Sequence, residues 1–517
     1  MKTFSLLFLV LIQFSVLAQS LKTPDPIDPV AMAKYKKAIE ASPDSLSFHE
    51  EFIKAAGWTR NLIWQSDKYQ SRFDSVLTSL QDQYKKWSKQ FPKSYTVPLA
   101  IGSALYEAES PLATAYLKKV IEVNPKLADG YFKLAIDAER WGNREEAKEY
   151  MRKASVADQA NPAYEFYYDM YFDEENMNVF KEKIYALANK FPDHERGAQG
   201  LYWLGVDTKD LAERIKIYED LRKRYSPLKI GWSESGMNGL FTCYMNTNEF
   251  DKALSLAESM QSKRGWGSQI RYAKGFAAIN SLVGKRDYKT AIDSIMALSK
   301  IRIYGSGNKL KLLLAEIADK SGNTKMAYDS LLKVQAKEPT DDLLKTIKGY
   351  ATKLGKNDND IYKEIWTIRD KYSKPATPFE LGLYTSDKKA KLSDYQGKVI
   401  LMTFWFPGCG PCRGEFPWFE NVVKKFKGQD LVYLGINVSP LQDQYVIPFM
   451  KGTKYSFIPL RGTGDWAQSA YGVRGEPTNF LIDGKGNIVF ANFRTDRENG
   501  RTLELMISEL LSRDKIK

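Results

Sequence analysis

A change of residue pattern near Arg369 constrains the fold of this chain more than any other feature. From about Val30 to Ile368, alanines and larger apolar residues recur at the spacing of amphipathic helices, with short polar turns between them. Beyond it, short runs rich in β-branched and aromatic residues are typical of strands. Pro375 and Pro378 lie at the change and cannot continue a helix. The sequence therefore predicts an all-helical region followed by a region of mixed α/β structure.

The helical region repeats its own pattern. Ala113 and Ala147 stand at equivalent places 34 residues apart, and Ala253, Ala291 and Ala327 follow at spacings of 38 and 36. Small residues let paired helices approach closely, and a period of 34 is that of a tetratricopeptide unit. The region resembles the tetratricopeptide family, which implies a helical-repeat solenoid with a groove for a peptide or a partner protein. A helical spacer without a ligand is the alternative.

The second region contains four runs with the composition of strands. They are KVILMTFWF (398–406), DLVYLGINV (430–438), TNFLID (478–483) and NIVFANF (487–493). A turn of sequence DGKG joins the last two as a hairpin, one helix follows the first strand over 410–425, and another closes the region over 503–511. We therefore predict an α/β sandwich over 379–517, a linker over 369–378, and the helical region over 19–368.

The chain begins MKTFSLLFLVLIQFSVLAQS, which has the pattern of a secretory signal. Lys2 supplies a positive start, and Phe4 to Leu17 form an apolar run that is too short to span a bilayer. We expect a signal peptide over 1–18, cut after Ala18, and an extracytoplasmic location in the periplasm or cell envelope. An uncleaved anchor is the alternative.

The net charge of +13 could indicate a nucleic-acid partner. The excess of basic residues is spread along the chain, with neither a basic run nor a nucleic-acid motif. We therefore expect a solvated basic surface and no nucleic-acid partner.

The stretch FWFPGCGPCRGEFPWF holds Cys409 and Cys412, two of the three cysteines in 517 residues. The pair follows a predicted strand and begins a predicted helix, and Pro411 suits the first turn of that helix. The unpaired amides of the first turn favour the thiolate form of Cys409, which can attack a disulfide. Cys412 lies one helical turn later and can resolve the mixed disulfide. The spacing therefore predicts a redox site.

A zinc site and a structural disulfide are the other chemistries open to such a pair. Structural zinc requires about four ligands, and the rest of the chain offers only Cys243, His49 and His194, all in the helical region. A disulfide that closes so small a loop constrains the unfolded chain little. We therefore expect neither a metal nor a cofactor, and we expect Cys243 to be a buried core thiol.

Two separated motifs carry a further resemblance. ILMTFWFPGCGPCRGEFPWFENV, followed by YGVRGEPTNFLIDGKGNIV, resembles the thioredoxin superfamily and within it the extracytoplasmic TlpA/ResA-type disulfide reductases. The resemblance covers about a quarter of the chain, from Pro375 to Leu511. It implies that Cys409 is an exposed nucleophile and that Cys412 is the resolving cysteine.

The same resemblance implies how a substrate is bound. Pro477 would be a cis-proline facing the disulfide, and Glu476 would offer its backbone N–H and C=O to an extended substrate strand. Gly410 and Pro411 match the dipeptide of reducing thioredoxins and favour a reductase. An ordinary trans proline is the alternative at Pro477.

Three positions near the cysteines bear on acid–base chemistry and access. Glu415 would lie near the site and tune the thiol pKa values, and a solvated helix acid is the alternative. Thr403 stands where thioredoxins carry a buried acid. Gly408 replaces the tryptophan that usually precedes the first cysteine, which we expect to open the surface above Cys409.

These features predict an exported thiol-disulfide oxidoreductase that reduces protein disulfides. Its expected partners are protein thiol and disulfide clients, an upstream membrane or periplasmic reductant, and a protein or peptide bound to the helical repeats. One alternative is a peroxiredoxin-like peroxidase, although Phe406 replaces the threonine that such enzymes need three residues before the reactive cysteine. A redox-inactive binding module is the other.

Overall fold

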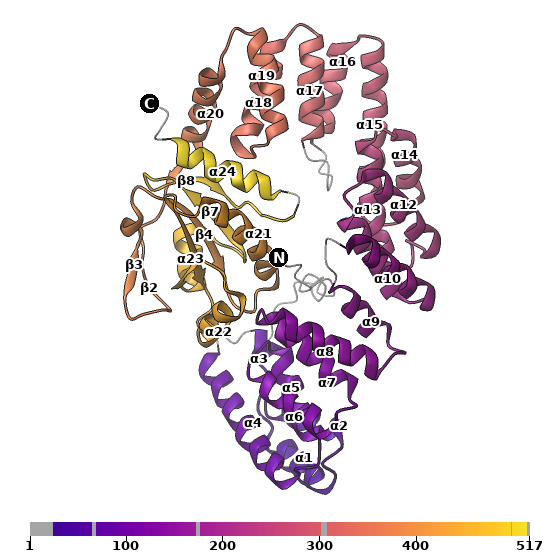
Figure 1. Cartoon of the computed structure of the whole chain (residues 1–517), viewed down its shortest axis with the longest axis vertical. Helices are drawn as coiled ribbons and strands as arrows, with labels where there is room; N and C mark the ends of the chain where they lie inside the picture. Colours follow the sequence, from indigo (N-terminus) through magenta and orange to yellow (C-terminus); the bar gives the residue numbers. More distant parts are fainter. Residues whose placement is uncertain (1–23, 65–68, 172–175, 301–307, 498, 514–517) are drawn as a thin grey trace. The chain divides into compact units, whose positions relative to one another are not determined.

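The computed structural model describes residues 24–64, 69–171, 176–300, 308–497 and 499–513 (Figure 1). The expected signal peptide over 1–18 lies outside these residues. The chain forms two compact units: the first joins the residues up to Tyr171 to those from Lys374 onward, and the second lies between Phe172 and Ser373. Among the described helices, none combines the length and apolar character needed to cross a membrane.

The helical part of the first unit contains α1 to α9. Their bounds are α1 (Pro29–Ala41), α2 (Leu46–Ala55), α3 (Arg60–Trp64), α4 (Gln70–Gln90), α5 (Thr96–Glu107), α6 (Ala113–Val123), α7 (Ala128–Arg140), α8 (Arg144–Ala157) and α9 (Pro162–Asp169).

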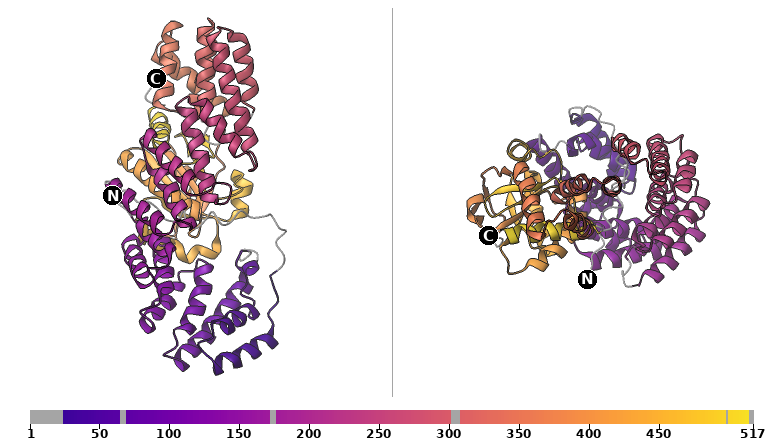
Figure 2. Two further views of the ribbon diagram at one scale, coloured as in Figure 1. Left: turned by 90° about the vertical axis from the view of Figure 1, so that its right-hand side faces the viewer. Right: turned by 90° about the horizontal axis from the view of Figure 1, so that it is seen from above.

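The elements described in the second unit are all α-helices joined by turns and loops, and successive helices lie side by side (Figure 2). Their bounds are α10 (Met177–Lys190), α11 (Glu195–Asp207), α12 (Leu211–Arg224), α13 (Gly231–Asn246), α14 (Phe250–Ser259), α15 (Trp266–Gly284), α16 (Tyr288–Leu298), α17 (Lys309–Lys320), α18 (Thr324–Lys337), α19 (Asp341–Lys353) and α20 (Asp358–Tyr372).

The repeated alanines have the place in the fold that their spacing predicted. Each lies near the start of the second helix of a pair (α6, α8, α14, α16 or α18), and each is fully buried; they are Ala113, Ala147, Ala253, Ala291 and Ala327. A side chain no larger than a methyl group lets the paired helices approach closely. The predicted all-helical region is confirmed, and its assignment to the tetratricopeptide family stays a prediction.

Two glycines make the turns between paired helices. Gly142 lies between α7 and α8 with φ +78°, and Gly322 lies between α17 and α18 with φ +85°. Only glycine adopts this left-handed conformation without steric cost, so both chain reversals depend on it.

The α/β part of the first unit follows α20. Its elements are β1 (Lys374–Pro375), β2 (Glu380–Gly382), β3 (Lys389–Lys391), η4 (Leu392–Tyr395), β4 (Val399–Trp405), α21 (Gly410–Val423), η5 (Lys424–Phe426), β5 (Leu431–Asn437), η6 (Pro440–Gln442), α22 (Asp443–Thr453), β6 (Ile458–Arg461), α23 (Gly464–Tyr471), β7 (Thr478–Ile482), β8 (Asn487–Ala491) and α24 (Gly500–Ser512).

Six of these strands form one mixed sheet in the order β1-β8-β7-β4-β5-β6. β4, β5 and β6 run parallel, whereas β7 pairs antiparallel with β4 and β8. All four predicted strands and the hairpin are confirmed. β6 was not predicted, and the last turn of α20 and β1 fall within the residues expected to form a linker.

Strand β4 lies inside the sheet and is buried on both faces, which explains its continuous apolar run. Its alternate residues Ile400, Met402 and Phe404 belong to the core that Ala467 of α23 joins. On the opposite face Trp405 is fully buried, with ring centroids 5.3 Å from Phe416 and 5.1 Å from Phe449 and Phe457. Strand β4 therefore ends, immediately before the cysteines, against a rigid aromatic cluster.

Replacing Trp405 with alanine is expected to destabilise the α/β domain by about 3–5 kcal/mol, because the indole fills a site closed by three aromatic rings. Hydrogen exchange of the β4 and β5 amides measures this loss. Tyr372→Ala is the control, because Tyr372 is 65% exposed and its removal should cost less than about 0.5 kcal/mol. Equal protection in the two variants would contradict the packing role.

Candidate active site

Cys409 and Cys412 form a disulfide at the start of α21, immediately after β4 and its connecting loop. Cys409 is the N-cap residue of α21, and its Sγ accepts a hydrogen bond of 3.2 Å from the backbone N–H of Cys412. Pro411 stands in the first turn, where its missing N–H costs nothing. The predicted position of the pair, at the N-terminus of a helix, is confirmed.

The expected exposure of Cys409 is wrong, because its residue surface is only 3% exposed. Gly408 does not open the surface as expected either. A Cβ atom at Gly408 would lie 2.8 Å from Oε2 of Glu109 and 2.9 Å from Nε2 of Gln442. The Gly408 N–H also donates to Oε1 of Gln442 over 2.6 Å. The space that a tryptophan would need is filled by Glu109, in the turn between α5 and α6, and by Gln442 of η6.

Arg413, which follows Cys412, connects the cysteine helix to the helical part of the same unit. Its side chain is 4% exposed and donates to the carbonyl oxygens of Arg140 (3.3 Å) and Gly408 (3.4 Å). The Glu109 carboxylate lies 3.8 Å away. Burial lowers the pKa of Arg413 to about 10, against the opposing attraction of Glu109. Sequence reasoning missed this residue, because nothing local indicates that a helix arginine will be buried.

Helix α22 also contacts the helical part of the first unit. The hydroxyl oxygens of Tyr445 and Ser110 are 3.2 Å apart, and the Tyr445 ring packs edge-on against Trp141 at 5.7 Å. Gly452 lies so close to Trp141 that a Cβ atom would overlap the Trp141 carbonyl oxygen. A Cβ at Gly142 would likewise lie 2.5 Å from Cγ2 of Thr453. The α7–α8 turn therefore packs closely on the α/β domain.

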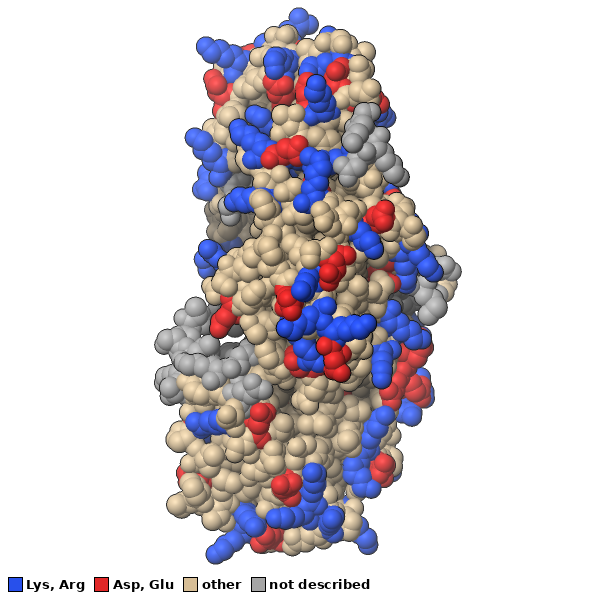
Figure 3. Space-filling model, turned by 90° about the vertical axis from the view of Figure 1, so that its left-hand side faces the viewer, with Lys and Arg blue, Asp and Glu red and all other residues tan. Residues whose placement is uncertain are grey.

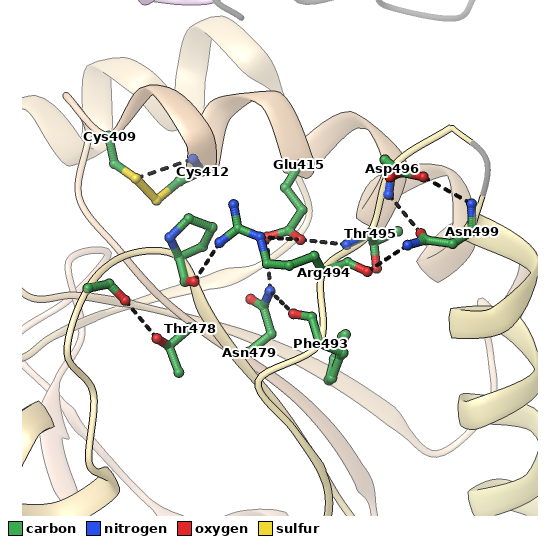
Figure 4. A network of polar contacts seen from close by, with 12 residues as sticks. Cys409, Cys412, Glu415, Thr478, Asn479, Phe493, Arg494, Thr495, Asp496 and Asn499 are labelled. Atoms are coloured by element: carbon green, nitrogen blue, oxygen red, sulfur yellow. Dashed lines mark hydrogen bonds and ion pairs between the residues drawn. A yellow bond between two sulfur atoms is a disulfide. The ribbon is translucent and has the colours of Figure 1, made fainter. Parts of the chain in front are cut away.

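Glu415 lies one helical turn after Cys412 and is 4% exposed, so the alternative of a solvated helix acid is wrong. Its Oε1 accepts from the backbone N–H of Thr495 over 2.6 Å, and its Oε2 accepts from Nδ2 of Asn479 over 2.9 Å (Figure 4). Nε of Arg494 lies 3.5 Å from Oε1. Burial raises the pKa of Glu415 more than the charge of Arg494 and these hydrogen bonds lower it. A carboxyl group with a raised pKa, close to a thiol, can exchange a proton with it.

The loop after β8 positions the partners of Glu415. The Asp496 N–H donates to Oδ1 of Asn499 over 2.8 Å, and Nδ2 of Asn499 donates to the Arg494 carbonyl over 3.0 Å (Figure 4). These bonds hold Arg494 and Thr495 at the carboxylate. The sequence did not indicate this loop, because it lies about 80 residues from Glu415 along the chain.

Asn479 is a second residue that sequence reasoning missed. It lies opposite Thr403 in the β4–β7 pair, and both side chains are fully buried. Besides its bond to Glu415, Nδ2 of Asn479 donates to the Phe493 carbonyl over 2.9 Å. Thr403, which stands where thioredoxins carry a buried acid, thus lies opposite Asn479, and Asn479 in turn binds the buried acid Glu415. The position of Asn479, two residues after Pro477, was the signal that could have indicated it.

The Glu476–Pro477 peptide bond is cis, as the resemblance implied. Nη1 of Arg494 donates to the Pro477 carbonyl over 2.7 Å, so one guanidinium contacts both the cis-proline segment and Glu415. Thr478, the first residue of β7, donates through its hydroxyl to the Gly475 carbonyl over 2.7 Å (Figure 4). Arg494 therefore joins the cis-proline segment to the buried acid, which lies on the same helix as the disulfide.

Other charged groups are dispersed. Figure 3 shows Lys and Arg interspersed with Asp and Glu over the face drawn, in keeping with the diffuse excess of positive charge seen in the sequence. Within the described residues, no cluster of three or more His, Cys, Asp and Glu side chains is arranged to bind a metal ion. Cys243 in α13 is 2% exposed, which confirms the predicted core thiol.

Comparison with known proteins shows what the C-terminal part of this chain is similar to. The model of the AhpC/TSA family matches residues 373–491. The thiol-disulfide oxidoreductase ResA of Bacillus subtilis (strain 168) is 36% identical over 105 residues, which are 20% of this chain and 58% of that relative. The C-terminal domain is related to the ResA thiol-disulfide oxidoreductases. The chain spans little more than half the length of the ResA relative.

Two other similar proteins each cover about a quarter of this chain. The thioredoxin-like protein YneN of Bacillus subtilis (strain 168) is 26% identical over 152 residues, 27% of this chain and 88% of that protein. A crystal structure of a thiol:disulfide interchange protein from Chlorobium tepidum TLS has 24% sequence identity and a TM-score of 0.24, and covers 27% of this chain and 96% of that chain.

The buried acid of the ResA-related domain predicts a pH effect on stability. Because burial raises the folded-state pKa of Glu415, its contribution to stability is fully present below its unfolded pKa and is lost as the pH rises through the folded value. Glu415→Gln should therefore gain stability relative to the wild type as the pH rises from about 4 to about 8. Hydrogen exchange of β4 and β7 amides across this range measures the difference. A difference that does not change with pH would show that Glu415 titrates normally.

Proposed function

We propose that this chain is an exported thiol-disulfide oxidoreductase that reduces protein disulfides through Cys409 and Cys412. The observation that carries the proposal is the cysteine pair at the N-terminus of α21, held as a disulfide within a domain related to ResA. The pair can accept two electrons as a disulfide and donate two as a dithiol.

The reduced pair would act in two exchange steps. The Cys409 thiolate attacks one sulfur of a client disulfide, a Cys409–client disulfide forms, and the second client sulfur leaves as a thiolate and takes a proton. The Cys412 sulfur then attacks Cys409 Sγ, releases the first client sulfur and closes the Cys409–Cys412 disulfide. Two electrons pass to the client, and a reductant carrying a dithiol must restore the pair.

Glu415 would handle the proton of the second step. The Cys412 thiol must lose its proton before it attacks, and Glu415 lies one helical turn away within the same buried region. Because burial raises its pKa toward that of a thiol, the Glu415 carboxylate is a better acceptor for that proton than a solvated carboxylate. Asn479 and Thr495 would act as positioning residues, because they hold the carboxylate through hydrogen bonds.

The cis-proline segment would bind the client. An extended client strand beside Glu476 could pair with its backbone N–H and C=O, while Pro477, Gly410 and Pro411 border the disulfide. Arg494 supports this role, because its bond to the Pro477 carbonyl orients the segment.

Two further features of the sequence support a cellular location and a binding partner. The apolar N-terminal sequence supports export to the periplasm or cell envelope, where an upstream membrane or periplasmic reductant would recharge the pair. The 34-residue recurrence supports tetratricopeptide-like repeats that bind a protein or peptide partner.

A direct test mixes the fully reduced protein with a synthetic peptide containing one internal disulfide. We expect one mole of peptide dithiol to form per mole of oxidised Cys409–Cys412 pair, measured by mass spectrometry after acid quenching. Oxidation of the pair by hydrogen peroxide, without exchange with the peptide, would instead favour the peroxidase alternative. Inertness toward both reagents would favour a redox-inactive module.

A further inference from the structure

The burial of Cys409 requires an explanation that the exchange chemistry does not supply. Its sulfur must meet a client sulfur, yet Cys409 is 3% exposed. The α5–α6 turn (residues 108–112) lies against Gly408, and the end of α7 with the α7–α8 turn (residues 140–143) contacts Arg413, so the two segments meet the chain on either side of the cysteine. We propose that these two segments, here called the cap, occupy the client-docking surface and must be displaced before Cys409 can react.

The cap contacts the residue directly before the nucleophile and the side chain four residues after it. On one side the Glu109 carboxylate lies against Gly408, so closely that a Cβ atom there would be 2.8 Å from Oε2. On the other side the Arg140 carbonyl accepts a hydrogen bond from the buried Arg413 side chain over 3.3 Å. A client approaching Cys409 would need the space that Glu109 and Arg140 now occupy.

The cap fits the α/β domain through its shape. Gly142 and Gly452 each lie where a single added methyl group would overlap the opposite surface. Trp141 packs on Tyr445, whose hydroxyl contacts the Ser110 hydroxyl. Both segments of the cap thus contact one side chain of α22. Packing this close indicates a specific contact between the cap and the α/β domain.

The charges at this contact allow the cap to separate from the α/β domain. Burial disfavours the charged form of Arg413, and the acids that oppose this effect, chiefly Glu109 with smaller contributions from Glu139 and Asp137, all belong to the helical part. Arg140, also from the helical part, adds repulsion. When the cap leaves, the Arg413 guanidinium regains water, which offsets the loss of Glu109. The close packing favours the state in which the cap covers Cys409. Burial of the Arg413 cation favours the state in which the cap is displaced.

The cap also accounts for a departure from the thioredoxin pattern. A tryptophan at position 408 would collide with Glu109 and Gln442, so the glycine there suits a chain whose own helical segment covers the disulfide. Displacement by a client would restrict reduction to proteins that can bind in place of the cap. This consequence for clients rests on the proposed function, whereas the occlusion of Cys409 does not.

The test uses the full chain carrying Cys412→Ser, so that Cys409 is a single thiol at the site. Gly452→Ala adds a methyl group that would overlap the Trp141 carbonyl, while alanine is favoured over glycine within helix α22. We expect a maleimide carrying a long polyethylene glycol chain to modify Cys409 about tenfold faster in this variant. Peptide mapping measures the modified fraction over time.

Two controls separate opening of the cap from general unfolding. Gly349→Ala is the matched substitution, because Gly349 lies in α19 with open space where a Cβ would be added, and it should leave the Cys409 rate unchanged. Cys243, 2% exposed in α13, should remain unmodified in every variant. Modification of Cys243 together with Cys409 would show unfolding and would overturn this explanation of the faster rate.

A second variant tests the charge. Glu109 has φ +50°, a conformation that asparagine tolerates, so Glu109→Asn removes the carboxylate and keeps the turn. Its Cys409 rate should also rise, by several-fold. If wild-type Cys409 already reacts as fast as in both variants, the cap is wrong. If Cys409 becomes accessible and still reduces no peptide disulfide once Cys412 is restored, the cap stands and the proposed oxidoreductase fails.

Discussion

Replacing Cys409 with serine is expected to reduce disulfide exchange by on the order of a thousandfold or more, to the uncatalysed background. A serine hydroxyl stays protonated near neutral pH and is not a nucleophile toward sulfur. Cys412 cannot substitute for it, because Cys412 is fully buried inside the first turn of α21. The measurement is the rate at which the reduced protein converts a peptide disulfide to its dithiol.

Cys243→Ala is the matched control for this loss. It also removes one thiol, but from the core of α13, so the exchange rate should stay within about twofold of the wild type when compared at equal folded protein. If Cys409→Ser retained a substantial rate while Cys243→Ala lost it, the site would have been assigned to the wrong cysteine.

Replacing Cys412 with serine should have the opposite signature. Cys409 can still attack a client disulfide, but the second step has no sulfur to complete it, so a Cys409–client disulfide accumulates. With a peptide that holds one disulfide, we expect a mixed disulfide approaching one mole per mole of protein. Mass spectrometry without reducing agent measures it, and added dithiol should release the peptide.

The double variant Cys409→Ser with Cys412→Ser is the control for adducts formed elsewhere, and it should form none at the site. The cap bears on the rate, so Gly452→Ala together with Cys412→Ser should reach the same final occupancy sooner. If Cys412→Ser formed no adduct even with Gly452→Ala, while the wild type turned over, Cys412 would not be the resolving residue.

Much of the local structure was predictable because the responsible interactions are near in sequence. The strand composition of β4, the DGKG turn before β8, and the proline in the first turn of α21 each act within a few residues. The recurrence of buried alanines likewise predicted paired helices, because each pair is formed by adjacent segments. Resemblance, rather than pattern, supplied the cis bond before Pro477.

The properties of the site depend on contacts between distant segments, and these were not predictable. Whether Glu415 is solvated or buried depends on Asn479 and Thr495, which lie 64 and 80 residues away. The surroundings of Cys409 likewise include Glu109 against Gly408 and Arg140 against Arg413, with Arg140 lying 273 residues from its partner Arg413.

The amino-acid sequence by itself determined that two thiols stand one turn apart at the start of a helix that follows a buried strand, because local backbone preferences and apolar spacing suffice for that. The tertiary structure alone decided how buried those two residues are and which distant segments surround them. Burial and charge depend on every segment that approaches a side chain, and Glu109, in the turn between α5 and α6, lies against Gly408 although it is about 300 residues away along the chain.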